Sequence, residues 1–278
     1  MNFLMFLAPV LGPVLGFIYN LVNNYGLAII LFTIVIKLVL FPLTIKQQKS
    51  TAEMAAMKPE IDAINKKYKD DKEKLQKEMM ALYQKHGVNP AAGCLPMLIQ
   101  LPILFALYRV IYMPLTYILN LSSDTVNAII EKLELPAAAQ QIEIASKLTP
   151  ENIAKLASAG IEGLRSIDFN FLWLDLARAP QMNEFSLLWL IPILAGATTY
   201  FSSKMMTGAQ PSAGGDTAAS MNKNMMVIFP IFTVWICFSM PSGVGLYWVI
   251  SNVLSMLQQY IYNIMKSKKS ESGVKKDD

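Results

Sequence analysis

The sequence has little charge and few of the residues that bind metals. Asp, Glu, Lys and Arg make up 16% of its 278 residues, against roughly 25% in an average globular chain. It has one histidine, His86, and two cysteines, Cys94 and Cys237, with no C-x-x-C spacing. These counts exclude a disulfide framework and the usual metal sites. They also exclude a disordered chain and a soluble nucleic-acid-binding protein, and we expect no cofactor.

Charge is absent from long stretches of a chain that is 54% hydrophobic. With His86 counted as neutral, the uncharged stretches are residues 1–36, 86–108, 185–203 and 224–265. Because about 20 apolar residues span a bilayer, the sequence predicts an all-α, multi-pass membrane protein. We expect five transmembrane helices, at residues 26–45, 94–117, 185–202, 222–240 and 242–264. The break between the last two is expected at Pro241-Ser242-Gly243.

The spans divide the chain into segments. These are an N-terminal interfacial helix (1–22), the first transmembrane helix (23–45), a cytoplasmic helical hairpin (46–92), the second transmembrane helix (93–117), an extracellular region (118–184), transmembrane helices three to five (185–265) with a short cytoplasmic loop (203–223), and a basic cytoplasmic tail (266–278). A sixth span is the alternative for residues 1–22. Gly12-x-x-x-Gly16 fits a helix-pairing motif or a bend, and the adjacent Pro13 favours the bend.

The orientation follows from the charges between the spans. Residues 46–92 carry ten Lys and seven acidic residues, and residues 266–278 carry five Lys and three acidic residues. Residues 203–223 carry two Lys and one acidic residue, whereas 118–184 carry five basic and nine acidic residues. The positive-inside rule therefore predicts a plasma-membrane protein with its N-terminus outside and its C-terminus in the cytoplasm.

The segment 46–92 has the apolar spacing of two packed helices. Its predicted contact residues are Met54, Met57, Ile61, Leu75, Met79 and Leu82, with Ile64 and Tyr68 on the same face. Steps of three and four residues on either side of a polar turn are typical of an antiparallel helical hairpin. Pro59 is expected to kink its first arm. A solubilising loop is one interpretation, and a docking or gating element is favoured by the strong amphipathic pattern.

Lys37 lies near the middle of the first predicted span. A lysine at that depth costs at least about 2.5–3.5 kcal/mol. None of the five spans contains an Asp or Glu that could compensate for it. The cytoplasmic end of the helix lies roughly 12 Å away, farther than a lysine side chain reaches. We therefore expect a water-filled cavity around Lys37.

Other polar residues gather at the middle and cytoplasmic depths of the predicted spans. The predicted groove residues are Thr33, Lys37, Gln100, Thr198, Ser251, Asn252, Ser255, Gln258 and Gln259. They predict a hydrophilic groove that opens to the cytoplasm and is closed on the outside. Hydrogen bonds that hold helices together are the alternative for each hydroxyl and amide, although not for Lys37.

Two stretches resemble the YidC/Oxa/Alb family of membrane protein insertases. They are residues 87–108 (GVNPAAGCLPMLIQLPILFALY) and 240–252 (MPSGVGLYWVISN), the second followed by Gln258-Gln259. The segments 41–44 (FPLT) and 78–83 (EMMALY) add to the resemblance, which covers about residues 20–265. It implies a positively charged, cytoplasm-facing groove, in which Lys37 takes the place of the usual arginine. The chain is similar to the compact form of the family, without the large periplasmic domain.

The sequence thus predicts an insertase that is not an enzyme and has no catalytic residues. Its expected partners are nascent membrane proteins, the ribosome, the Sec translocon and membrane lipids. A solute transporter or channel with a mid-membrane cation site is the alternative, although no internal repeat supports it. A membrane enzyme acting on lipid is disfavoured because the spans contain no acid–base pair. The basic tail favours ribosome or lipid binding and simple anchoring equally.

Overall fold

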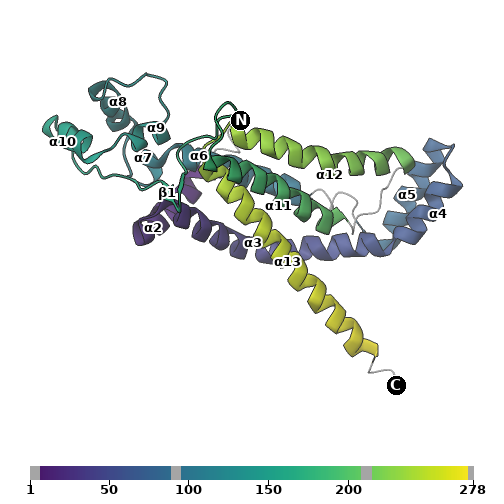
Figure 1. The fold of residues 1–278 in the computed structure, drawn as a ribbon. Helices are drawn as coiled ribbons and strands as arrows, with labels where there is room; N and C mark the ends of the chain where they lie inside the picture. The colour runs from purple at the N-terminus through teal and green to yellow at the C-terminus, as the bar shows by residue number, and fades with distance from the viewer. Residues whose placement is uncertain (1–6, 89–94, 208–214, 275–278) are drawn as a thin grey trace. The chain divides into compact units, whose positions relative to one another are not determined.

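The computed structural model describes the backbone of residues 7–88, 95–207 and 215–274, which is mostly helical (Figure 1). Side chains are described for the same residues except 95–101, 206–207, 215–223, 225 and 266–274. The chain forms two compact units. Unit 1 comprises Met1–Ile36, Gln100–Ala195 and Val234–Ile250, and unit 2 comprises Lys37–Ile99, Gly196–Thr233 and Ser251–Asp278.

The long helices correspond to the predicted apolar segments. They are α2 (Ala8–Val22), α3 (Tyr25–Ala56), α6 (Leu95–Tyr112), α11 (Leu190–Thr207), α12 (Gly215–Phe238) and α13 (Ser242–Val274). Among the described residues, α3 alone is long and apolar enough to cross a membrane by length and composition. Shorter apolar helices are Ala8–Val22, Pro102–Tyr112 and Met226–Phe238. The count of five spans therefore stays a prediction.

Several helices begin or end away from the predicted boundaries. Helix α3 continues past residue 45 to Ala56, and α13 continues into the predicted tail as far as Val274. Helices α11 and α12 both extend into the predicted loop 203–223. The sequence contains no proline between residues 43 and 58 or after 241 that would stop α3 or α13 earlier. Polar composition alone does not end a helix, because charged side chains are good helix formers.

Proline explains why a helix ends inside the predicted second span. Helix α6 ends at Tyr112, and the short helix α7 (Pro114–Tyr117) follows it. Met113 between them has φ −120° and ψ 54°, since a residue before proline disfavours the helical conformation. The predicted break before the last span is confirmed, because α12 ends at Phe238 and α13 begins at Ser242, next to Pro241.

In unit 1, α2 is packed against α7. It continues through Pro13 without interruption and buries Ala8, Leu15 and Tyr19. The bend expected at Gly12 stays a prediction. A Cβ atom on Gly12 would collide with the Tyr117 ring, and one on Gly16 would collide with the Tyr117 carbonyl oxygen. The two glycines therefore allow close helix packing, as a helix-pairing motif requires.

Residues 118–184, also in unit 1, contain three short helices in the order of the chain. These are α8 (Ser123–Lys132), α9 (Gln141–Ser146) and α10 (Pro150–Ser158). Side chains cap α8 and α10, because Ser122 accepts a hydrogen bond from the Thr125 N–H and Thr149 accepts one from the Asn152 N–H. The all-α expectation needs one correction. Strands β1 (Asn170–Phe171) and β2 (Leu174–Asp175) form an antiparallel pair with Asn170 opposite Asp175.

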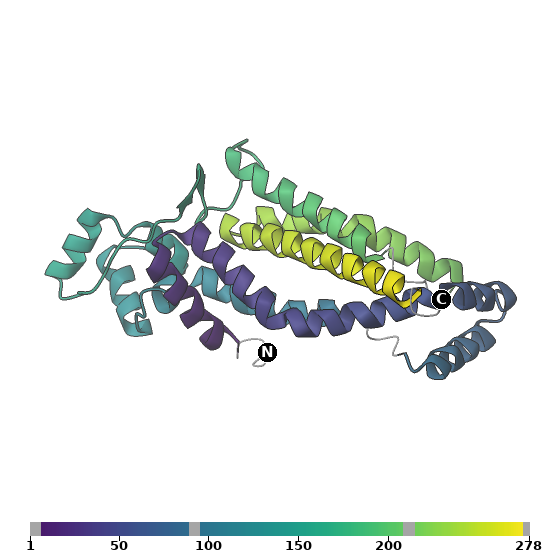
Figure 2. The same ribbon diagram turned by 90° about the horizontal axis from the view of Figure 1, so that it is seen from below.

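Unit 2 contains the predicted hairpin. Helices α4 (Lys58–Lys67) and α5 (Lys72–His86) lie side by side (Figure 1, Figure 2). The first arm is interrupted at Met57, where α3 has ended and Pro59 occupies the first turn of α4. The apolar cluster of the hairpin consists of Met57, Ile61, Leu75, Met79, Leu82 and Tyr83. Burial raises the pKa of the Tyr83 hydroxyl above its usual value.

Candidate functional site

The polar site is built around Lys37, on helix α3 in unit 2. Its Nζ donates a hydrogen bond to Ser255 Oγ on α13, with a distance of 2.7 Å. Ser255 Oγ in turn donates to the carbonyl oxygen of Ser251, one turn earlier in α13, at 2.9 Å. The donation fixes the direction of the hydroxyl, so that an oxygen lone pair faces the ammonium. Lys37 and Ser255 are each partly buried.

The charge of Lys37 has no carboxylate partner among the side chains that the structure describes. Ion pairs among those residues include those of Lys49, Lys85, His86 and Arg178. A lysine ammonium has three N–H donors, and the hydrogen bond to Ser255 uses one of them. A single hydroxyl satisfies a donor but does not neutralise a positive charge. No described side chain therefore neutralises an ammonium at this position.

Asn252 forms a second set of polar contacts in unit 2. Its Nδ2 donates to Thr198 Oγ1 at 3.2 Å and to Thr199 Oγ1 at 2.9 Å, both on α11. These bonds fasten α13 to α11. Thr199 was not among the predicted groove residues. The signal for it was its place next to Thr198, since one asparagine amide group carries two protons and can reach neighbouring hydroxyls.

The remaining predicted groove residues are placed differently. In unit 2, Ser251 is buried, Gln258 is partly exposed, and Gln259 donates to Asn263 of its own helix at 3.0 Å. In unit 1, Thr33 is completely buried and donates to the Ile29 carbonyl oxygen at 2.6 Å. This hydroxyl bonds to its own helix, so the bond does not hold two helices together. The Gln100 side chain lies outside the described side chains.

The predicted contact residues of the hairpin lie in its interior. Five of the six belong to the apolar cluster that joins α4 to α5, and Met54 on α3 is buried outside that cluster. These side chains are used within the hairpin and offer no surface to a partner. The exposed side of the hairpin carries mainly charged residues, together with Met80, which is exposed.

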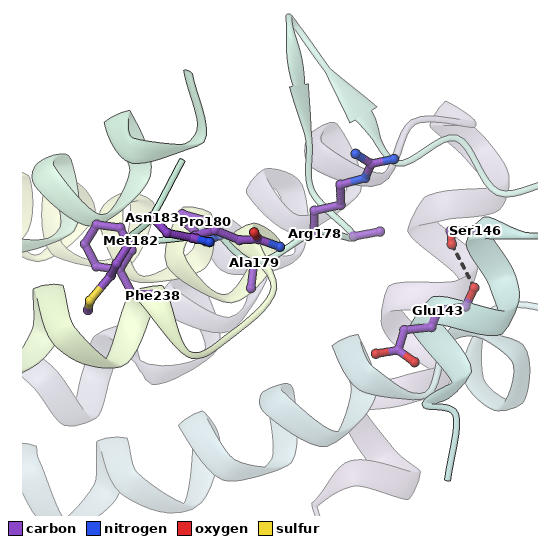
Figure 3. Close-up of a pocket in the computed structure, with 10 residues that line it drawn as sticks. Glu143, Ser146, Arg178, Ala179, Pro180, Met182, Asn183 and Phe238 are labelled. Atoms are coloured by element: carbon purple, nitrogen blue, oxygen red, sulfur yellow. Dashed lines mark hydrogen bonds between the residues drawn. The ribbon is translucent and has the colours of Figure 1, made fainter. Parts of the chain in front are cut away.

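A pocket lies in unit 1, next to residues 177–183 (Figure 3). Glu143 and Arg178 contribute opposite charges to its lining, and Phe238 contributes an apolar side. Ser146 Oγ donates to the Glu143 carbonyl oxygen at 2.7 Å, so the hydroxyl is engaged within α9. Among the described residues, no group of His, Cys, Asp and Glu could hold a metal ion.

Comparisons with known proteins agree with the resemblance found in the sequence. A family model described as 60Kd inner membrane protein matches residues 17–270. The membrane protein insertase YidC of Fusobacterium nucleatum is 34% identical over 245 residues, which cover 88% of each chain. The YidC of Clostridium perfringens is 34% identical over 253 residues, covering 91% of this chain and 84% of that one.

A longer relative and a solved structure match only in part of their length. The YidC of Beijerinckia indica is 33% identical over 262 residues, which cover 94% of this chain and 36% of that protein. A crystal structure of an active YidC insertase, with the first transmembrane domain resolved, has a TM-score of 0.52 and 28% sequence identity. The match covers 92% of this chain and 46% of the crystallised one.

Proposed function

Because this chain belongs to the family of the 60Kd inner membrane protein, we propose that it is a membrane protein insertase, which brings nascent hydrophobic segments into the bilayer. The observation that carries the mechanism is the Lys37 ammonium. It lies within an apolar helix, and its hydrogen-bond partner is a hydroxyl instead of a carboxylate. The alternative of a solute transporter finds no support in the comparisons.

The proposed site is a hydrophilic groove that opens toward the cytoplasm. Lys37 supplies its charge, and Ser255, Gln258 and Asn252 supply hydroxyl and amide groups on α13. The charge counts support five spans, an outside N-terminus and a cytoplasmic C-terminus. In that orientation the hairpin of α4 and α5 lies in the cytoplasm, where a nascent chain and its ribosome would be met first. A Sec translocon is a further proposed partner.

The first step of the mechanism is electrostatic. A short acidic flank of a client enters the groove and replaces water beside Lys37. At a separation of 4 Å and an effective dielectric constant of 20, a carboxylate and an ammonium attract each other by about 4 kcal/mol. This attraction offsets part of the cost of taking a carboxylate out of water. A groove that reaches part-way across the bilayer also shortens the apolar barrier that the flank must cross.

The second step is driven by the hydrophobic effect. The apolar segment of the client moves sideways into lipid, and each Å² of apolar surface buried contributes about 25 cal/mol. Neither step breaks or forms a covalent bond, so the proposed activity is not that of an enzyme. It also needs no nucleotide, and the sequence contains no P-loop.

Reconstituted vesicles test the electrostatic step. Two clients are compared, one with an acidic external tail and a matched one in which every tail carboxylate is replaced by its amide. We expect Lys37→Ala to slow insertion of the acidic client at least about tenfold, which corresponds to about 1.4 kcal/mol of lost attraction. The Lys37→Ala protein should insert the neutral client at the unchanged rate, and the Lys37→Arg protein should insert both clients.

The matched client separates the charge effect from damage to the protein. If Lys37→Ala slowed both clients equally, the substitution would have disturbed the fold. If it inserted the acidic client at the normal rate, Lys37 would not attract carboxylates and the proposed step would be wrong. Photocrosslinking a stalled client from position 255, with the exposed Asn263 position as the control, would then show whether the groove is used at all.

A further inference from the structure

The segment that includes strands β1 and β2 is fastened to the first residues of two long helices in unit 1. The Tyr25 N–H at the start of α3 donates to the Asp168 carbonyl oxygen at 3.0 Å. At the start of α13, the Gly243 N–H donates to the Leu176 carbonyl oxygen, also at 3.0 Å. The Ser242 N–H donates to the Arg178 carbonyl oxygen at 2.9 Å. Backbone hydrogen bonds therefore attach the segment that contains the β-hairpin to the N-terminal ends of both helices.

Two aromatic side chains of the same segment reinforce this attachment. The Phe169 ring meets the Tyr25 ring edge-on, with 4.9 Å between their centroids. The Phe171 ring covers Gly26, where a Cβ atom would collide with it. Phe169 is buried and Phe171 is partly buried. The base of the β-hairpin is thus held by aromatic packing as well as by backbone hydrogen bonds.

The turn of the β-hairpin is apolar and exposed. Leu172, which has a φ of 55°, is 71% exposed, and Trp173 is 84% exposed. The two strands form a narrow projection beside Arg178 (Figure 3). At the base, Arg178 Nε pairs with Asp175 Oδ2 at 3.0 Å, and both side chains reach solvent. The projection therefore has an apolar tip and a charged base.

The exposed apolar surface continues from the β-hairpin into helix α11. Strand β2 contacts the 3₁₀ helix η2 (Leu187–Trp189), which leads directly into α11. Leu187, Leu190 and Ile193 are exposed at intervals of three residues along this path. In a membrane protein such a stripe faces lipid, because apolar side chains can be exposed to hydrocarbon without the free-energy cost of exposing them to water. The turn thus joins a surface that already faces lipid.

We propose that the turn Leu172–Trp173 inserts into the lipid headgroup layer that borders the first residues of α3 and α13. Tryptophan favours this layer because its ring is apolar and its N–H still reaches a polar partner. The inserted turn fixes the depth of unit 1 in the bilayer. This inference rests on the chain's residence in a membrane and does not depend on the passage of clients along Lys37.

Spin labelling of the full-length chain in vesicles tests the proposal. A nitroxide is attached at Leu172→Cys in a background with Cys94→Ser and Cys237→Ala, and its collisions with oxygen and with a water-soluble nickel chelate are compared. Oxygen concentrates in lipid and the chelate in water. We expect the label at 172 to collide more with oxygen. Asn127→Cys on α8 is the matched control, because that position is exposed and its helix is polar, so its label should favour the chelate.

Two other outcomes would overturn the proposal. Equal access of the chelate to positions 172 and 127 would place the turn in water. Protection of position 172 from both reagents would mean that protein covers it, as a second copy of the chain would. Trp173→Cys provides an independent label in case Leu172→Cys fails to fold, because Leu172 has the left-handed backbone conformation and Trp173 does not.

Discussion

The hydrogen bond between Lys37 and Ser255 leads to a quantitative prediction about their coupling. Ser255→Ala removes the hydroxyl that accepts from the Lys37 ammonium. In the protein with Lys37, this change should lower the free energy of unfolding by about 2 kcal/mol, near the lower end of the range for hydrogen bonds to charged groups because water can partly replace the hydroxyl. The same substitution in a Lys37→Met background should cost much less.

The expected difference follows from the two bonds of the Ser255 hydroxyl. After Lys37→Met, Ser255 still donates to the Ser251 carbonyl oxygen of its own helix, a back-bond that adds little to the stability of a helix. The coupling energy between positions 37 and 255 should therefore be about 1–2 kcal/mol. Lys37→Met by itself should not destabilise the protein, since it removes a charge that costs at least about 2.5 kcal/mol at the centre of a span.

A double-mutant cycle measures this coupling. The four proteins are unfolded by increasing fractions of a denaturing detergent in mixed micelles, and the loss of helix is followed by circular dichroism. Ser255→Thr is the control that keeps a hydroxyl, and it should retain most of the coupling. If Ser255→Ala cost the same free energy with Lys37 and with Met at position 37, the hydroxyl would not hold the ammonium, and the electrostatic geometry proposed for the groove would be wrong.

Three further substitutions test other contacts. Gly26→Ala should lower the free energy of unfolding by about 1–3 kcal/mol in a thermal melt, because the added methyl group collides with the Phe171 ring. Ile61→Ala should cost about 2–5 kcal/mol of hairpin stability, seen as faster amide hydrogen exchange in α4 and α5 with little change in unit 1. Asn252→Leu, which removes the bonds to Thr198 and Thr199, should increase the spread of distances between spin labels on α11 and α13; an unchanged distribution would contradict the proposed fastening.

Much of the hairpin was predictable because its signal is local. The steps of three and four residues between Met57, Ile61, Leu75 and Met79 place these side chains on one face of each helix. The face that each helix of such a pair buries against the other must be its apolar face. The helix ends were harder to predict, because polar composition does not end a helix: α3 continues through the polar residues after position 45 as far as Ala56.

The sequence identified Lys37 because the cost of a charge in an apolar segment depends on composition alone. It could not show that Ser255 accepts the hydrogen bond, because the pairing depends on the rotation of α3 and α13 about their axes. The same holds for Thr33. Its spacing from Lys37 suggested a groove residue, but the structure buries its side chain, and its hydroxyl bonds to its own helix.

Periodicity, charge distribution and motifs therefore determined the helical class and the family, and they predicted a role for one lysine. Only the tertiary structure decided that Gly12 and Gly16 allow a close approach of Tyr117, and that Phe171 covers Gly26 while Trp173 faces outward. The physical reason is that apolar spacing reports which face of an element avoids water. The partner that covers this face comes from a distant part of the chain and is selected by packing in three dimensions.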